Sequence, residues 1–211
     1  MKRTIFLMLA VLLSALSASA YAFKVDGIAY NKNGDGKSVY VAYGGDYTGP
    51  VTIPERVTYD GATYSVTTIG DYAFSDCTGL TSVTIPSSVT SIGKSAFSGC
   101  TGLTSVTIPN SVTEIGWSAF EGCTALTSVT FNATNCKSPD RTYEAWFQDC
   151  PLTSLVIGND VKSIPSCLAY YQTRLTTVTI PNSVISIGWY AFVGCTGLTS
   201  VTIPNSVTEI G

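Results

Sequence analysis

The hydrophobic residues of this chain recur with a period close to 23 residues. The unit that opens at Cys100 reads L-x-x-V-x-I-P and then V-x-x-I-G-x-x-A-F-x-x-C, with apolar side chains at Leu103, Val106, Ile108, Val112, Ile115, Ala119 and Phe120. Successive units open at Cys77, Cys100, Cys123, Cys150, Gln172 and Cys195. Neighbouring openings are 23 residues apart, except that the interval before Cys150 is 27 and the interval after it is 22. A regular interval of this size indicates a repeat architecture.

The spacing within a unit predicts one short strand followed by a tight turn. The alternation at Val106 and Ile108 is typical of a strand with its apolar side chains pointing inward. Pro109 has no N–H to donate, so we expect the strand to end there. We expect a turn at Gly116 that a Cβ would hinder. The following segment, "WSAFEGC", is long enough for one helical turn and no more.

A single unit of this kind cannot bury its own apolar side, whereas stacked units can cover one another. The sequence therefore predicts a repeat solenoid over residues 66–211, in which each unit forms one rung. Its strands would form a parallel ladder joined by short helical or irregular turns. Equivalent side chains would fill the interior, including a column of Phe74, Phe97, Phe120, Phe147 and Phe192. The unit between the last two is degenerate, with Ala169 in place of Phe.

The two ends of the chain differ from the repeats. Residues 1–20 begin with Lys2 and Arg3, continue as an apolar stretch too short for a membrane span, and end in small residues, which is typical of a secretory signal peptide. Residues 21–65 contain an alternating pattern around a turn-rich centre, which predicts a β-hairpin cap over the first rung. The last unit stops midway at Gly211, so we expect a fragment of a longer protein, a truncated product or an engineered boundary.

The 23-residue period, with its I-P, I-G and A-F-x-x-C landmarks, closely resembles the BspA-like leucine-rich repeats of bacterial surface proteins. The resemblance covers roughly residues 66–211, and residues 23–70 are similar to the opening segment of that family. The resemblance implies a protein secreted by a bacterium or displayed on its surface. It also implies adhesion to host matrix proteins, to other bacteria or to host cells.

Composition narrows the classes of function. Without Lys2 and Arg3 the chain has 9 basic and 14 acidic residues, a net charge of −5, which argues against nucleic acid as a partner. It has no histidine, which removes Ser-His and Cys-His nucleophile pairs and every His-ligated zinc site. Nucleophile elbows, phosphate loops and metal-ligand clusters are also missing from the sequence. We therefore expect no enzyme, no cofactor and no transmembrane segment in the mature chain.

Seven cysteines follow the signal peptide, in a compartment that permits disulfides. Five of them recur at one position of the unit: Cys77, Cys100, Cys123, Cys150 and Cys195. We interpret these as a column of buried thiols that act as small apolar side chains. Bridges between neighbouring rungs are the alternative, and Cys136 and Cys167, which lie outside the column, could bridge each other.

Three sets of residues are candidates for an interaction surface. The first varies after each Ile-Gly pair and includes Tyr72, Lys94, Trp117, Trp189 and Tyr190, where Trp and Tyr are favoured anchors. The second is a flat hydroxyl face on the outer side of the strands: Thr104, Ser105, Thr107, Thr127, Ser128 and Thr130. The third is Asp140 and Arg141, in a loop of about four extra residues in the 123–149 unit. The alternatives are that Trp117 and Trp189 are partial core and that Thr merely suits exposed strand positions.

These observations favour a scaffold that binds an extracellular protein, a host matrix component or a cell-surface ligand, with glycans as a further class. A repeated surface offers no single enclosed pocket for a reaction. A structural spacer that presents another domain, or a carbohydrate-binding accessory module, is the alternative function.

Overall fold

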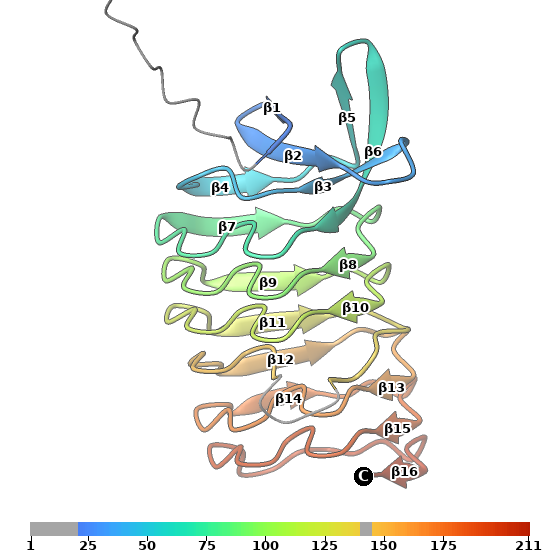
Figure 1. Cartoon of the computed structure of the whole chain (residues 1–211). Coiled ribbons are helices and arrows are strands. Elements are labelled where there is room, and N and C mark those ends of the chain that lie inside the picture. Colours follow the sequence, from blue (N-terminus) through green and yellow to red (C-terminus); the bar gives the residue numbers. More distant parts are fainter. Residues whose placement is uncertain (1–20, 140–144) are drawn as a thin grey trace, which may run out of the picture.

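The protein folds as a β-solenoid in which each repeat forms one rung of a stack (Figure 1). The computed structural model describes residues 21–139 and 145–211, and these contain strands and turns with no helix. Residues 1–20, which carry the predicted signal peptide, lie outside the described residues.

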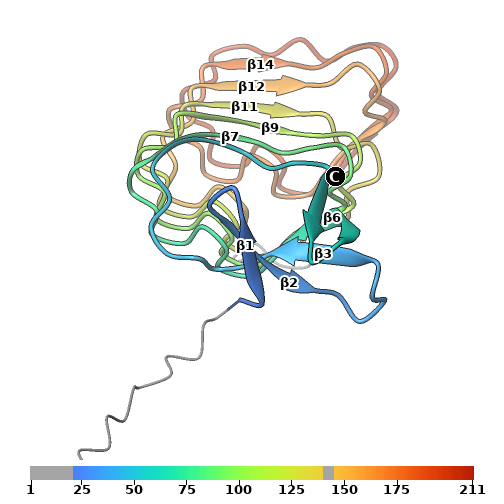
Figure 2. The ribbon, with the colours of Figure 1, turned by 90° about the horizontal axis from the view of Figure 1, so that it is seen from above.

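One side of the stack is a ladder of longer strands (Figure 2). These strands are β4 (Gly49–Thr52), β7 (Leu80–Thr84), β9 (Ser105–Ile108), β11 (Ser128–Phe131), β12 (Ser154–Ile157) and β14 (Thr177–Thr179). Strands β9, β11, β12 and β14 form one parallel sheet, and β4 pairs in parallel with β7, which lies beside β9. Val106 and Ile108 are buried and Thr107 is exposed, so the predicted inward-facing alternation is confirmed.

A second, shorter strand in most rungs was not expected from the sequence; the described part of the rung that contains β11 has none. These are β8 (Ser91–Ile92), β10 (Glu114–Ile115), β13 (Ser163–Ile164), β15 (Ser186–Ile187) and β16 (Glu209–Ile210). Strand β8 pairs in parallel with β10, and β15 pairs in parallel with β13 and β16. Two residues are too few to show a period of two, which explains why the pattern did not reveal them.

The N-terminal strands close the top of the stack in Figure 1. They are β1 (Phe23–Val25), β2 (Ile28–Lys32), β3 (Ser38–Val41), β5 (Arg56–Tyr59) and β6 (Ala62–Ile69). Strands β1, β2 and β3 pair antiparallel in sequence, as the predicted hairpin requires. Strand β6 runs across residues 65 and 66, where the sequence predicted the boundary between the cap and the repeat array. It pairs in parallel with β8, so the N-terminal strands and the first short strand share one sheet.

The turn after each short strand is irregular, so the helical alternative was wrong for the described residues. Its backbone N–H groups bond to the next rung: Phe97 N donates to Ala119 O at 2.8 Å, and Gly99 N donates to Glu121 O at 2.8 Å. An α-helix would need those N–H groups for bonds within its own segment. The turns are therefore a third ladder between rungs.

The predicted phenylalanine column fills the interior. The ring centroids of Phe74 and Phe97, and of Phe97 and Phe120, are 5.0 Å apart, and those of Phe120 and Phe147 are 5.2 Å apart. Burial of each ring contributes about 1.5–3 kcal/mol. Ala169 interrupts the column, and Phe192 beyond it is only half-buried.

The repeated cysteines form a column of free thiols, as predicted, and each donates a hydrogen bond to the preceding rung. Cys100 Sγ donates to Phe74 O at 3.0 Å, and Cys123 Sγ donates to Phe97 O at 3.1 Å. All seven cysteines are free, so neither of the alternatives, bridges between neighbouring rungs or a Cys136–Cys167 bridge, is present. Cys136 faces a carbonyl of its own loop, and Cys167 faces the carbonyl of Trp189.

Candidate interaction surface

The variable positions follow a glycine that the stack itself requires. A Cβ at Gly116 would collide with the backbone nitrogen of Lys94, in the preceding rung. Gly116 is therefore needed for close approach between rungs, rather than for the turn that the sequence suggested. The left-handed conformation falls two residues later, at Ser118, where φ is 55°. The equivalent residues Tyr72 and Tyr190 have φ of 57° and 58°.

Three of the predicted residues contact one another on successive rungs. The ammonium nitrogen of Lys94 lies 3.7 Å from the centroid of the Trp117 ring and 5.3 Å from that of Tyr72. Backbone bonds tie the same positions together, because Tyr72 N donates to Lys94 O at 2.9 Å. Asp71 Oδ1 also accepts from Lys94 N at 2.8 Å. The cation thus holds two exposed aromatic rings in a fixed arrangement.

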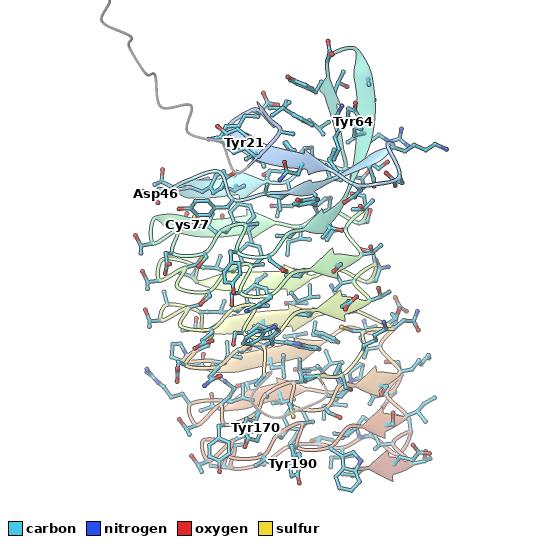
Figure 3. The ribbon with its side chains drawn as sticks, viewed as in Figure 1. Tyr21, Asp46, Tyr64, Cys77, Tyr170 and Tyr190 are labelled. Atoms are coloured by element: carbon cyan, nitrogen blue, oxygen red, sulfur yellow. The ribbon has the colours of Figure 1, made fainter. Side chains whose placement is uncertain are left out.

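A second pair lies near the other end of the stack, where Figure 3 labels Tyr190. The rings of Trp189 and Tyr190 meet edge to face, with centroids 6.3 Å apart. Trp189 is 67% exposed and Trp117 is 47% exposed, so both side chains reach solvent. We call the five residues Tyr72, Lys94, Trp117, Trp189 and Tyr190 the aromatic strip.

The aromatic strip is divided into two groups. Three rung steps separate Trp117 from Trp189, or about 15 Å at the usual spacing of neighbouring strands. The intervening described equivalent is Ser166, which is small and half-buried. A partner that engages both groups must therefore be large.

The hydroxyl face is present but less open than predicted. Ser105 and Thr107 on β9 are exposed, as is Thr104 just before it. Ser105 lies opposite Ser128 and Thr107 opposite Thr130 on β11. Ser128 and Thr130 are only half-buried rather than exposed. On β12 the exposed Val156 interrupts the series.

Threonine hydroxyl groups beside this face form hydrogen bonds between neighbouring rungs. Thr127 Oγ1 donates to Thr104 O at 3.5 Å, and Thr153 Oγ1 donates to Thr127 O at 3.2 Å. Thr176 repeats the bond one rung later, at 3.2 Å to Thr153 O. These donors link rungs and are not free for a partner.

The insertion in the 123–149 unit is described only in part. Asp140 and Arg141 lie outside the described residues. The end of the same insertion re-enters the core, where Trp146 is buried and its Nε1 donates to Ile115 O at 3.1 Å. Its ring also packs against Phe131, with centroids 6.2 Å apart. That Trp146 belongs to the core could not be predicted from the repeat pattern, because the extra residues before it leave its position within the unit undefined.

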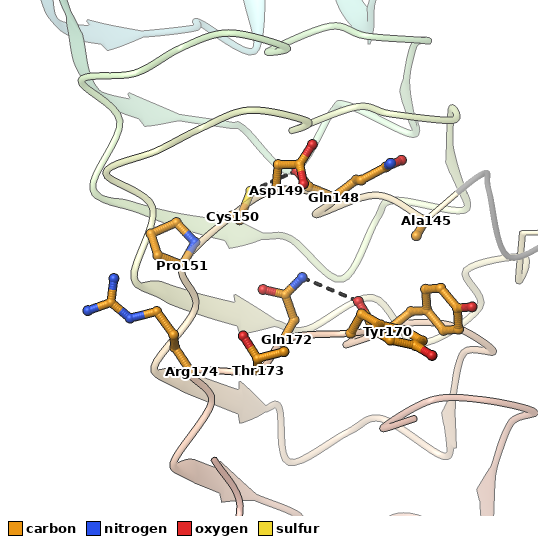
Figure 4. A pocket seen from close by; sticks show the side chains of 10 residues that line it. Ala145, Gln148, Asp149, Cys150, Pro151, Tyr170, Gln172, Thr173 and Arg174 are labelled. Carbon is orange, nitrogen blue, oxygen red and sulfur yellow. Dashed lines mark hydrogen bonds between the residues drawn. The ribbon is translucent and has the colours of Figure 1, made fainter. Parts of the chain in front are cut away.

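A pocket that the sequence analysis did not anticipate lies between two rungs of the turn ladder (Figure 4). It has a volume of about 690 Å³, and its lining includes Gln148, Asp149, Pro151, Tyr171, Gln172 and Arg174. Two features of the sequence could have indicated this pocket. The unit that opens at Cys150 has 22 residues instead of 23, and its turn contains Tyr170 and Tyr171.

The thiols are poor nucleophiles. Burial raises the pKa of Cys100 to about 12 and, together with Glu114, that of Cys136 to about 12. In residues 21–139 and 145–211 no group of three or more His, Cys, Asp or Glu residues could hold a metal ion. Within those same ranges no helix is long and apolar enough to cross a bilayer.

Comparison with known proteins identifies the class as a leucine-rich repeat solenoid. The family model of the BspA type leucine rich repeat region matches six copies, over residues 61–168 and 166–211. The chain belongs to this BspA-type family, whose repeat fold is a scaffold rather than a catalytic architecture. A search of curated proteins found no match.

Solved structures of bacterial proteins share the fold. A leucine-rich repeat protein from Bacteroides ovatus is 32% identical with a TM-score of 0.70, over 90% of this chain and 49% of that one. A leucine rich cell surface protein from Faecalibacterium prausnitzii is 35% identical with a TM-score of 0.62, over 92% of this chain and 52% of that one. The chain thus spans about half the length of these relatives.

Proposed function

We propose that this is a secreted or surface-displayed bacterial protein that binds extracellular macromolecules, such as a host matrix or cell-surface protein, and so mediates adhesion. The single observation that carries the proposal is the aromatic strip, whose five residues project from a rigid ladder of backbone hydrogen bonds. Membership of a family with a cell-surface relative supports it, as does the signal-like composition of residues 1–20.

The chemistry of the strip suits a protein partner. Large aromatic side chains and cations are frequent anchors of protein interfaces, and they lose little conformational entropy when they are already ordered. Lys94 is held between two rings, so its charge is presented at a fixed point. Affinity would come from two separate groups on one rigid surface, each of which contributes modestly.

A binding screen of the purified chain against extracellular matrix proteins and cells tests the proposal. We expect micromolar binding that weakens at least tenfold in the double variant Trp117→Ala, Trp189→Ala, since each anchor contributes about 1 kcal/mol or more. Tyr43→Ala is the matched control, because Tyr43 is an exposed aromatic residue at 45% exposure that lies outside the strip. Absence of binding to any matrix protein or cell at micromolar concentration would contradict adhesion and favour the spacer function.

A further inference from the structure

The pocket of Figure 4 lies beside a departure from the repeat. Only Pro151 stands between Cys150 and Leu152, whereas two residues stand between Cys100 and Leu103. This connection is one residue shorter than its equivalent in the 100–122 unit, and Pro151 lines the pocket. A hollow of about 690 Å³ lies between this connection and residues 170–174. This volume falls within the range of small-molecule sites in proteins, roughly 300–1,000 Å³.

Tyr171 is the residue just before the one that opens a unit, a position that is glycine in three of the other units. Its φ is 55°, and the equivalent Gly99, Gly122 and Gly194 have φ of 73°, 69° and 75°. A left-handed conformation costs a residue with a Cβ roughly 1–2 kcal/mol. Asp76 and Asp149 also adopt this conformation, with φ of 60° and 56°, but Tyr171 is the one aromatic residue among these equivalent positions. A large ring at a strained backbone position suits a functional role.

The ring of Tyr171 is held by two neighbours, since it also meets the ring of Tyr170 edge to face, with centroids 4.7 Å apart. A Cβ placed on Gly194 would come within 2.8 Å of Tyr171 Cγ, so the ring rests on the backbone of the following rung. The side chain is nevertheless 60% exposed and lines the pocket. The Tyr171 ring is therefore an ordered aromatic platform that is largely accessible to solvent.

An acidic and a basic side chain line the pocket together with the Tyr171 ring. Asp149 comes from the rung on one side of the pocket and Arg174 from the rung on the other. Gln172 forms a buried floor, where its Nε2 donates to Phe147 O at 2.8 Å and to Tyr170 O at 3.4 Å. Its Oε1 accepts no hydrogen bond within the described part of the chain. The site offers acceptors, donors and an aromatic face without any deep apolar recess.

We propose that this pocket binds a neutral saccharide unit of one or two rings. The apolar face of a sugar ring would stack on Tyr171, and its hydroxyl groups would bond to the carboxylate of Asp149 and the guanidinium of Arg174. A carboxylate accepts from hydroxyls and a guanidinium donates to them, so the pair matches a ligand that both donates and accepts. Because the two charges cancel, the pocket favours neutral ligands over ionic ones. No residue of the aromatic strip lines the pocket, so the proposal does not depend on the strip.

An array of neutral mono- to tetrasaccharides, followed by calorimetric titration of the sugars that bind, tests the proposal on the full chain. We expect at least one sugar to bind and Tyr171→Gly to weaken it about tenfold, as loss of one aromatic contact does. Tyr171→Gly restores the residue used in other rungs, so the fold should be retained and unfolding should confirm it. Asp149→Asn should also weaken binding, and Tyr43→Ala should leave it unchanged.

Three results would overturn the proposal: no sugar bound at about 10 mM, equal affinity for the parent chain and Tyr171→Gly, or selective binding of charged peptides in place of sugars. The test is independent of the adhesion proposal. Tyr171→Gly should leave binding of matrix proteins intact, whereas Trp117→Ala with Trp189→Ala should leave sugar binding intact.

Discussion

The side-chain amide of Gln172 donates a hydrogen bond to the carbonyl oxygen of Phe147 at 2.8 Å, in the place where other rungs use a thiol. Cys150 Sγ makes the equivalent bond to Phe120 O at 3.0 Å, and Cys195 Sγ makes it to Ala169 O at 3.0 Å. The residue that opens each of these units therefore donates to a carbonyl of the preceding rung. The replacement of Cys by Gln preserves this role.

Removal of that donor should destabilise the protein. Gln172→Ala leaves the buried carbonyl of Phe147 with one bond fewer and should lower the free energy of unfolding by about 1–3 kcal/mol. Gln172→Cys restores a donor and should cost less. Denaturant unfolding measures both, with the exposed Gln148→Ala as control, for which we expect a change within about 0.5 kcal/mol. Equal losses for the two Gln172 variants would show that the bond is irrelevant.

The phenylalanine column should dominate the stability of the stack. Phe120 is fully buried between two rings, so Phe120→Ala should lower the free energy of unfolding by about 3–5 kcal/mol. Phe192 is half-buried beyond the gap at Ala169, and Phe192→Ala should cost clearly less. Unfolding followed by tryptophan fluorescence compares the two variants. A similar loss at both positions would be inconsistent with a continuous column that ends before Ala169.

The thiols should be protected in the folded state and should couple stability to pH. Burial raises the pKa of Cys100 to about 12, and a hydrogen bond with Cys150 together with burial raises the pKa of Cys123. Both thiols should therefore stay protonated at pH 8, where iodoacetamide should not label them. In the unfolded chain their pKa returns to about 8.5. The folded state then binds more protons, and its stability should fall as pH rises above that value. Mass spectrometry after alkylation at pH 8, with and without denaturant, checks this; rapid labelling of the native protein would refute it.

Much of the fold follows from particular sequence features. The fixed interval between Cys100 and Cys123, with Val106 and Ile108 alternating, predicted both the stack and the side of the strand that is buried. The short strands were missed because two residues cannot display a period. The turn was open to a helical interpretation, because a segment such as 117–123 does not reveal that its N–H groups bond to another rung.

The surface was harder to predict. Variation after each Ile-Gly pair singled out Trp117 and Trp189, and both are exposed. The contact between Lys94 and two rings depends on the rung spacing, which aligns residues 22 or 23 positions apart along the chain. The pocket at Tyr171 lies beside a one-residue shortening whose spatial effect the repeat pattern does not reveal.

A crystal structure of the chain tests most directly the claim that successive repeats stack as rungs and expose the aromatic strip. We predict parallel rings of Phe97 and Phe120 with centroids close to 5.0 Å apart, Thr107 opposite Thr130, and Trp117 and Trp189 in solvent. Phenylalanine rings that point into solvent, or repeats that fold as separate units, would contradict the account.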